Sequence, residues 1–310
     1  MPEVPARPIP RGVGLALIAG IAVLFASNHV AARLAFDHGT SVVTAVLVRS
    51  AVTALAVAVL LRATGTSGSL AAPTRRHAVL IGLVLSVQSV CLYASVARIP
   101  VALALLTFNS FPVVLALLSW ATGGERPTRR TAIAMPVILS GLVLALDVPG
   151  VLSSGGRSLE DPARFAAGVG FGLAASLAFG TALLLTTRWM GAVDGRVRTL
   201  WSMGVVSAVA LAGGLAIDGF AWPADPMGWT GLALLTVLYG TAFTSLFVVL
   251  PRLGAVNSAP AMNLEPIASM ALAWLLLGQR IGWVQVAGGV LVVGAIVWTS
   301  LGPKPAPRGG

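Results

Sequence analysis

Long apolar runs separated by short polar segments fill the chain from residue 13 to residue 301. Each run has about 20 residues with few charges, the length that a helix needs to cross the hydrocarbon core of a bilayer. The runs cover residues 13–35, 42–62, 78–97, 100–121, 131–148, 165–187, 199–219, 228–250, 254–277 and 281–301. This pattern predicts an all-α membrane protein with ten transmembrane helices.

Composition points the same way. Hydrophobic residues make up 57% of the 310 residues and charged residues only 10%, whereas a soluble domain carries about 25% charge. The single cysteine excludes a disulfide framework, and three dispersed histidines give no zinc motif. We therefore expect no cofactor and no metal.

The net charge of +10 indicates which surface the chain contacts. The basic residues lie between the apolar runs, so a lipid bilayer is a better partner than nucleic acid. With the N-terminus in the cytoplasm, 14 of the 20 Lys and Arg residues are cytoplasmic and five external, and Arg49 lies inside the second run. The positive-inside rule then predicts a multi-pass inner (plasma) membrane protein with both termini cytoplasmic.

The chain also contains an internal repeat. Residues 92–126 match residues 246–280 after a shift of 154 positions. The shared positions are Leu92/Leu246, Arg98/Arg252, Asn109/Asn263, Pro112/Pro266, Leu118/Leu272, Trp120/Trp274, Gly124/Gly278 and Arg126/Arg280. Two halves, 12–148 and 165–301, are thus joined by a linker at 149–164, with a cytoplasmic tail at 1–11 and a disordered tail at 302–310. Five spans per half place the second half in the inverted orientation, an arrangement found in transporters.

These features resemble the drug/metabolite transporter superfamily, in its EamA-type branch, over nearly the whole chain. The resemblance rests on the two five-span halves, on Asn28, Arg33 and Arg49, and on the paired blocks around GGERPTRR and NLEP…LLGQRIGWVQVAGGVLVVG. Such families usually carry Gly-Glu-Arg after the fourth span of each half. The first copy keeps it at residues 124–126, but the second has Gln279 in place of the acid. The resemblance implies a ten-helix transporter of small organic solutes, often an exporter.

Glu265 is the only acid deep in any apolar run. A charge at bilayer depth costs about 2.5–3.5 kcal/mol on insertion scales, so it needs a function or a partner. Flanking Pro260 and Pro266 remove backbone donors and free carbonyls that a protein-lined cavity can satisfy. Glu265 is either a cavity-facing carboxylate that binds a cation or carries a proton, or a buried structural acid.

Two basic residues are candidates for coupling or gating. Arg49 lies about eight residues into its span, roughly 12 Å of helix from the end. An ion pair with Glu265 is favoured over binding of a substrate carboxylate, with snorkelling to the interface as a third hypothesis. His29 can titrate near neutral pH, so a proton role competes with a helix–helix hydrogen bond.

Polar side chains in equivalent spans are candidates for substrate binding. Stripes at helical spacing comprise Ser86, Ser89 and Tyr93 in the third span, and Thr236, Tyr239 and Phe243 in the eighth. A central cavity should be lined symmetrically, so we predict that Tyr93, Asn109, Tyr239, Asn263 and Glu265 surround a substrate. Hydroxyls also join helices, and the two asparagines can cap groups that the following prolines disturb.

Absent motifs narrow the function. The sequence has no HExxH, GxSxG or SxxK motif and no Walker loop, so neither an intramembrane hydrolase nor an ATP-driven pump is favoured. We predict a non-enzymatic secondary transporter, as a monomer or homodimer, that exports a small-molecule substrate by alternating access, with protons as the candidate coupling ion. The alternatives are a membrane enzyme acting on a lipid-linked substrate and a non-transporting membrane subunit.

Overall fold

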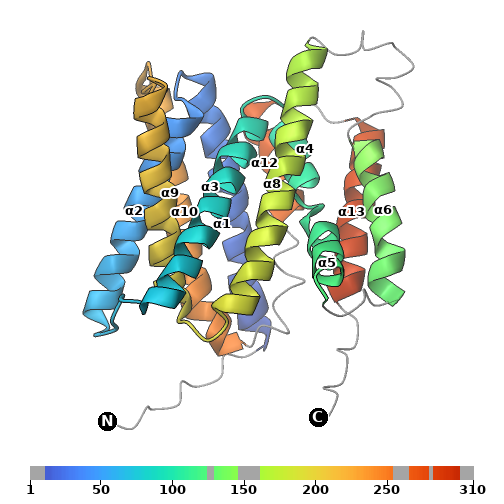
Figure 1. Ribbon diagram of the computed structural model, residues 1–310. Helices are drawn as coiled ribbons and strands as arrows, with labels where there is room; N and C mark the ends of the chain where they lie inside the picture. The colour runs from blue at the N-terminus through green and yellow to red at the C-terminus, as the bar shows by residue number, and fades with distance from the viewer. Residues whose placement is uncertain (1–10, 124–128, 146–160, 254–264, 279–281, 301–310) are drawn as a thin grey trace.

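The computed structural model describes residues 11–123, 129–145, 161–253, 265–278 and 282–300 (Figure 1). Within these ranges every regular element is a helix. The helices are α1 (Arg11–Asp37), α2 (Val42–Ala63), α3 (Ala72–Val96), α4 (Val101–Phe108), α5 (Phe111–Ala121), α6 (Arg129–Ala145), α8 (Pro162–Trp189), α9 (Gly195–Ala216), α10 (Pro226–Leu253), α12 (Glu265–Leu277) and α13 (Trp283–Ser300).

These helices correspond to the ten predicted spans, which confirms the all-α membrane fold with its two repeats. Among the described residues, five apolar segments of 18 or more residues meet the length and hydropathy expected of a membrane span. They are α2, α3, α8, α9 and the stretch from Val101 to Ala121. Shorter apolar helices lie at Ala132–Ala145 and Trp283–Ala295. Residues 254–264 of the predicted ninth span lie outside the described residues. The same is true of residues 1–10 and 301–310 at the two ends and of residues 149–160 of the linker.

The fourth span is broken, whereas the sequence predicted one continuous helix. The chain leaves helical geometry at Asn109 and Ser110, between α4 and α5. Pro112 has no backbone N–H to donate to the carbonyl four residues earlier. The Ser110 hydroxyl bonds instead to Thr107 O at 2.8 Å and to Ser176 Oγ of α8 at 2.9 Å. Hydrogen bonds to residues of both halves therefore stabilise the break between α4 and α5.

Several helices begin at a polar cap that satisfies otherwise unpaired backbone donors. The Ser41 hydroxyl accepts from Thr44 N at the start of α2, and the Asp161 carboxylate accepts from Arg164 N at the start of α8. Asp194 caps α9 by accepting from Arg196 N, and its carboxylate also pairs with the Arg196 guanidinium at 2.8 Å. Hydrogen bonding to that guanidinium lowers the pKa of Asp194.

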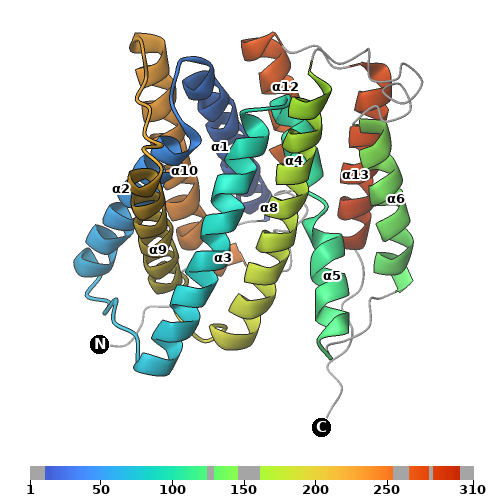
Figure 2. The same cartoon turned by 45° about the horizontal axis from the view of Figure 1, so that its top comes forward.

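The two halves interlock by reciprocal helix pairs (Figure 2). The first helix of one half packs against the third helix of the other, giving the pairs α1–α10 and α3–α8. The second helices pair with each other as α2–α9, and the last as α6–α13. Exchanging the halves maps this set of contacts onto itself, as inverted repeats require.

Glycines allow the paired helices to approach closely. A Cβ on Gly231 of α10 would lie 2.7 Å from Ala35 N of α1. A Cβ on Gly141 of α6 would lie 2.9 Å from Gly288 O of α13. Small residues at such contacts permit the backbone packing that joins helices in a membrane, where no hydrophobic force drives them together.

Hydrogen bonds at each end of the bundle join a loop of one half to a loop of the other half. At one end, Ser41 N donates to Ala221 O at 3.0 Å, joining the α1–α2 and α9–α10 loops. At the other end, the Arg196 guanidinium donates to Thr64 Oγ1 at 3.0 Å. The sequence assigns the first pair of loops to the external side and the second to the cytoplasmic side, so the relative placement agrees with inverted repeats.

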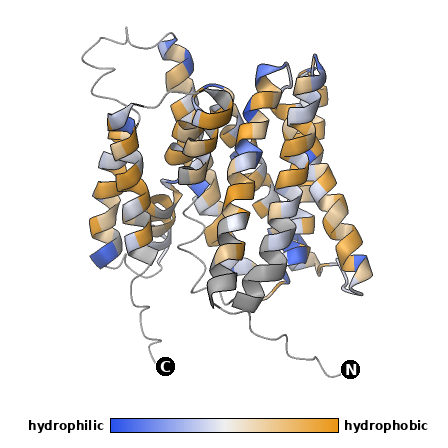
Figure 3. Ribbon diagram, turned by 180° about the vertical axis from the view of Figure 1, so that it is seen from behind, coloured by the Kyte–Doolittle hydropathy of each residue, from blue (hydrophilic) through white to orange (hydrophobic). Residues whose placement is uncertain are grey.

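Hydrophobic residues make up much of each helix, as the ribbon coloured by hydropathy in Figure 3 shows, and many large apolar side chains are exposed. Leu55, Leu215 and Leu275 are each 65% exposed or more. A surface of this kind is stable against lipid tails rather than water. The described chain is therefore a multi-pass membrane bundle with an apolar outer surface.

Candidate functional site

A group of buried or half-buried side chains, here called the polar cluster, lies between the two halves. Its members are Asn28 and His29 of α1, Arg49 of α2, Ser89 and Tyr93 of α3, Tyr239 of α10, and Glu265 of α12. The sequence predicted five of these seven as site residues. Side chains from five helices meet there because α1 packs against α3, α10 and α12, and α2 packs against α3 and α10.

Arg49 is held by two tyrosines from repeat-equivalent helices. Its Cζ lies 3.9 Å from the ring centroid of Tyr239 and 4.7 Å from that of Tyr93. Its Nη2 donates to Ser89 Oγ at 3.0 Å, and the residue is only 3% exposed. Each cation–π contact contributes about 0.5–2 kcal/mol, against the 2.5–3.5 kcal/mol or so that a buried charge costs. The rings thus offset much of the burial penalty.

Tyr93 links the cluster to its surroundings. The fully buried Tyr93 hydroxyl donates to Asn28 Oδ1 at 3.0 Å. Its ring contacts the His29 and Phe36 rings edge-on, with centroids 6.1 and 5.6 Å apart. The Tyr93 side chain is therefore fixed at both its polar and its apolar part.

Glu265 pairs with His29, not with Arg49. His29 Nε2 lies 3.3 Å from Glu265 Oε1, whereas no Arg49 nitrogen lies within 4.0 Å of a carboxylate oxygen of any described residue. The favoured ion pair of Glu265 with Arg49 is thus wrong in this structure. The physical reason is packing: α12 lies against α1, which carries His29, while the guanidinium is held on the rings of α3 and α10.

Asn109 has a structural contact at the break in the fourth span. Its Nδ2 donates to Leu105 O at 2.7 Å, at the end of α4. Leu105 O also accepts from Asn109 N at 2.8 Å, so it is not a carbonyl that Pro112 leaves without a donor. Capping and substrate binding by Asn109 both stay predictions. Asn263, at the equivalent repeat position, lies outside the described residues.

The hydroxyl stripes divide into two roles. The Ser86 and Thr236 hydroxyls bond to carbonyls one turn earlier in their own helices, at 2.8 Å each. Ser89 and the two tyrosines instead join the polar cluster. Sequence reasoning placed Asn28 in the first span without assigning it a site role, and it did not single out Phe36. An asparagine inside an apolar run was a usable signal for the first, but an apolar phenylalanine gave none for the second.

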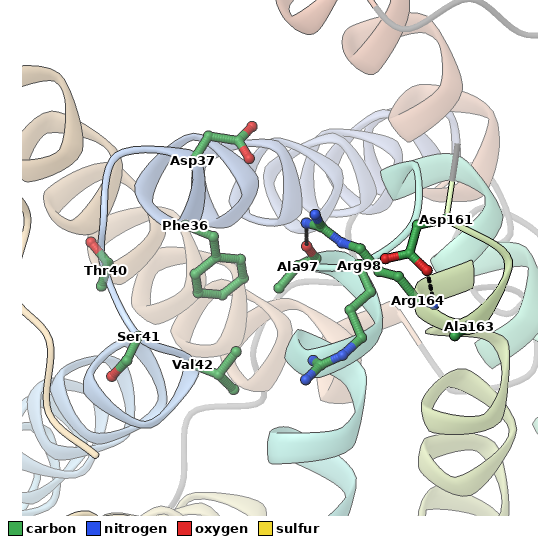
Figure 4. A pocket seen from close by; sticks show the side chains of 10 residues that line it. All are labelled: Phe36, Asp37, Thr40, Ser41, Val42, Ala97, Arg98, Asp161, Ala163 and Arg164. Atoms are coloured by element: carbon green, nitrogen blue, oxygen red, sulfur yellow. Dashed lines mark hydrogen bonds between the residues drawn. The ribbon is translucent and has the colours of Figure 1, made fainter. Parts of the chain in front are cut away.

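A pocket of about 570 Å³ opens at one end of the bundle. It is lined by Phe36, Asp37, Thr40, Ser41, Val42, Ala97, Arg98, Asp161, Ala163 and Arg164 (Figure 4). The sequence assigns this end to the external side. The pocket is not the predicted central one, because Tyr93, Asn109, Tyr239 and Glu265 do not line it. Phe36 lines the pocket and also contacts Tyr93, so a single side chain connects the pocket to the polar cluster.

Metal binding has no support in the described part of the chain, where no group of three or more His, Cys, Asp or Glu residues is placed to hold an ion. The chemistry available is that of one guanidinium, one imidazole–carboxylate pair and several neutral hydrogen-bonding groups. Such a set can bind a charged solute or move a proton.

Comparison with known proteins gives a family-level result. The EamA-like transporter family matches the chain twice, at residues 12–146 and 166–301. A solved structure described as "Crystal structure of protein" is similar in fold, with a TM-score of 0.64 and 18% sequence identity over 93% of this chain and 97% of its own. No curated protein matches the sequence.

Proposed function

Because this chain belongs to the EamA-like transporter family, we propose that it is a secondary transporter of a small organic metabolite or drug. Membership implies a membrane transporter of the drug/metabolite superfamily. The finer proposal is alternating access across an inner membrane, in the outward direction. One observation carries it: the polar cluster is assembled from both halves, with one tyrosine ring from each half against Arg49.

Alternating access requires a solute to reach the cluster from one side at a time. Phe36 lines the pocket at the predicted external end, and its ring packs against Tyr93. In this proposal a shift of Phe36 joins the pocket to the cluster. The reciprocal pairing of the helices allows an equivalent opening toward the cytoplasm when the two halves exchange conformations.

The energy source is proposed to be a proton gradient. The sequence has no ATP-binding loop, and the His29–Glu265 pair holds two titratable groups 3.3 Å apart between the halves. A pair of this kind can hold a proton in one conformation and release it in the other.

Counterflow in proteoliposomes tests the transport proposal. Purified protein is reconstituted, and labelled amino acids, nucleosides, aromatic carboxylates and cationic dyes are offered outside vesicles loaded with the same unlabelled compound. We expect saturable accumulation of at least one class above that of protein-free vesicles. Flux no greater than in protein-free vesicles for the whole panel would favour the membrane enzyme or the non-transporting subunit instead.

A further inference from the structure

Three buried side-chain nitrogens of the polar cluster have no hydrogen-bond partner among the described residues: Arg49 Nε, Asn28 Nδ2 and His29 Nδ1. Arg49 Nε and Asn28 Nδ2 can only donate, whereas His29 Nδ1 donates or accepts according to its tautomer. Asn28 is 0% exposed and Arg49 3% exposed. Buried polar groups without partners are rare in folded proteins and ask for an explanation such as a missing ligand. Because Arg49 Nε and Asn28 Nδ2 are donors, a group that pairs with them must be an acceptor.

The two donors belong to one neighbourhood. Tyr93 receives the guanidinium of Arg49 over its ring and donates its hydroxyl to Asn28 Oδ1. Both residues are therefore fixed by the same tyrosine, from helices α2 and α1. The rings of Tyr93 and Tyr239 lie against Arg49. Ring contacts with a guanidinium engage its face, whereas its N–H donors lie at its edge and remain able to bind an acceptor.

The charge balance of the cluster shows which acceptor fits. Arginine stays protonated in proteins, and its described partners, Ser89 and the two tyrosines, are neutral side chains. The one carboxylate of the cluster, Glu265, lies beside His29 instead. A buried cation without a counter-ion favours the binding of an anion.

We propose that Arg49 Nε and Asn28 Nδ2 bind the carboxylate of a small monoanionic solute, with the solute's apolar body against the surrounding aromatic rings. This inference rests on the proposed transport function, because it identifies the chemical class of the transported solute. A single guanidinium balances one negative charge, so a monocarboxylate fits better than a dianionic phosphate ester. A carboxylate also accepts bonds from two donors at once, as these two side chains require.

Three probes of the same shape and different charge test the proposal: benzoate, benzamide and benzylamine. Their binding to the purified, detergent-solubilised protein is measured by the shift of its thermal unfolding temperature. We expect benzoate to stabilise the wild-type protein saturably, with little effect of benzamide and none of benzylamine. Chloride at the same ionic strength serves as the small-anion control. A shift as large with chloride or benzamide as with benzoate would overturn the carboxylate assignment.

Variants then locate the site. In Arg49→Gln we expect benzoate affinity to fall about tenfold or more, as for a lost charge-assisted hydrogen bond. Arg49→Lys keeps the charge but lacks Nε, so it should weaken benzoate binding by an intermediate amount. Arg130→Gln is the matched control, because Arg130 also lies over a ring, that of Trp298 at 5.9 Å, but outside the cluster. Equal benzoate affinity in Arg49→Gln and wild type would overturn the proposal.

The two proposals can fail separately. Benzoate binding that depends on Arg49, in a protein that transports nothing in the counterflow panel, would keep the anion site and remove the transport function. Saturable transport of neutral or cationic solutes, with no benzoate binding to the wild type, would keep transport and remove the anion site. The wild-type comparison of benzoate with benzamide needs no variant, so poor folding of Arg49→Gln does not block the test.

Discussion

Glu265 and His29 bring together two titratable side chains from opposite halves of the molecule. Their 3.3 Å separation is a hydrogen-bonding contact when one of them carries the shared proton, and an ion pair when the imidazole is charged. The pair joins α12 to α1, so a change in its protonation alters a contact across the interface between the halves. Protonation and helix packing are thereby linked at one point.

Substitution of Glu265 tests this link. Glu265→Gln keeps the shape and one hydrogen bond to His29 but cannot carry a proton. We expect pH-gradient-driven accumulation to fall to the level seen without a gradient, while counterflow of the same substrate in vesicles is largely retained. Undiminished gradient-driven accumulation would shift the proton role to His29, which His29→Gln then checks.

Asp194 allows a prediction about pH outside the membrane. The Arg196 guanidinium lowers the pKa of this carboxyl, so the ionised form is favoured in the folded state. The resulting stabilisation is present above the ordinary aspartate pKa of about 3.9, and it is lost as pH falls through the lower folded-state value. Asp194→Asn should therefore lower the unfolding temperature slightly at pH 7, with a difference that shrinks below about pH 4.

A second substitution isolates that pair. In an Arg196→Gln background, Asp194→Asn should have a much smaller effect at pH 7, because the carboxylate has lost the guanidinium and keeps only its backbone hydrogen bond and the nearby Arg198. An unchanged effect of Asp194→Asn in that background would show that the cap, rather than the ion pair, carries the stabilisation.

Sequence reasoning at the residue scale found most polar members of the site but paired them incorrectly. A polar residue inside an apolar run stands out, because placing it in a membrane span costs free energy. This cost alone was enough to identify Arg49, His29, Tyr93, Tyr239 and Glu265. Their partners depend on which helices pack together, and this is not encoded in helical spacing. Contacts from α3 and α10 keep Arg49 away from Glu265, which no single-helix pattern could reveal.

At the scale of helices, close backbone approach sets the packing. The α6–α13 contact is an example, because a Cβ on Gly288 would lie against the backbone of Ala145 and Gly141. Backbone atoms cannot rotate aside as a side chain can. Glycine is therefore required at this crossing, whereas Gly294 of the same helix has no atom within 4 Å of a Cβ position.

These two glycines form a matched pair of tests. Gly288→Ala should destabilise the protein by about 1–3 kcal/mol, the usual cost of overpacking. Gly294→Ala should leave stability unchanged or slightly higher, because alanine is the better helix former. Unfolding in detergent under a denaturant series measures both. Equal losses in the two variants would show that α6 and α13 do not pack as described.

The spans were predictable from apolar length, but the break in the fourth was not. Hydropathy averages over about 20 residues and does not detect a two-residue departure from helical geometry. Pro112 was a local signal, yet proline within a membrane span is tolerated when neighbours satisfy the freed groups. Here Ser110 bonds to Ser176 of α8, a partner 66 residues away, so the outcome depended on tertiary contacts.

In the whole molecule, the inverted repeat joins fold and proposed function. An odd number of spans per half, read from the sequence, determines that equivalent helices run in opposite directions. The structure adds that α2 packs against both α3 and α10, the third helices of the two halves, so that the Tyr93 and Tyr239 rings both lie against Arg49. Each half thus supplies one tyrosine ring to a guanidinium that has no carboxylate partner among the described residues.

Absolute orientation in the membrane is the last prediction, and it follows from the arginine bias. Single cysteines are placed at exposed loop positions in a Cys91→Ala background. Positions 163 and 224 should react with an impermeant maleimide added to intact cells, because both lie at the end of the bundle predicted to be external. Positions 73 and 192, at the opposite end, should react only after the membrane is opened. Cysteine in place of the fully buried Ala104 should stay unlabelled throughout. Reversed labelling of the two pairs would show that the membrane orientation is the opposite of the predicted one and that the Phe36 pocket faces the cytoplasm. Mixed labelling within a pair would contradict the inverted repeat itself.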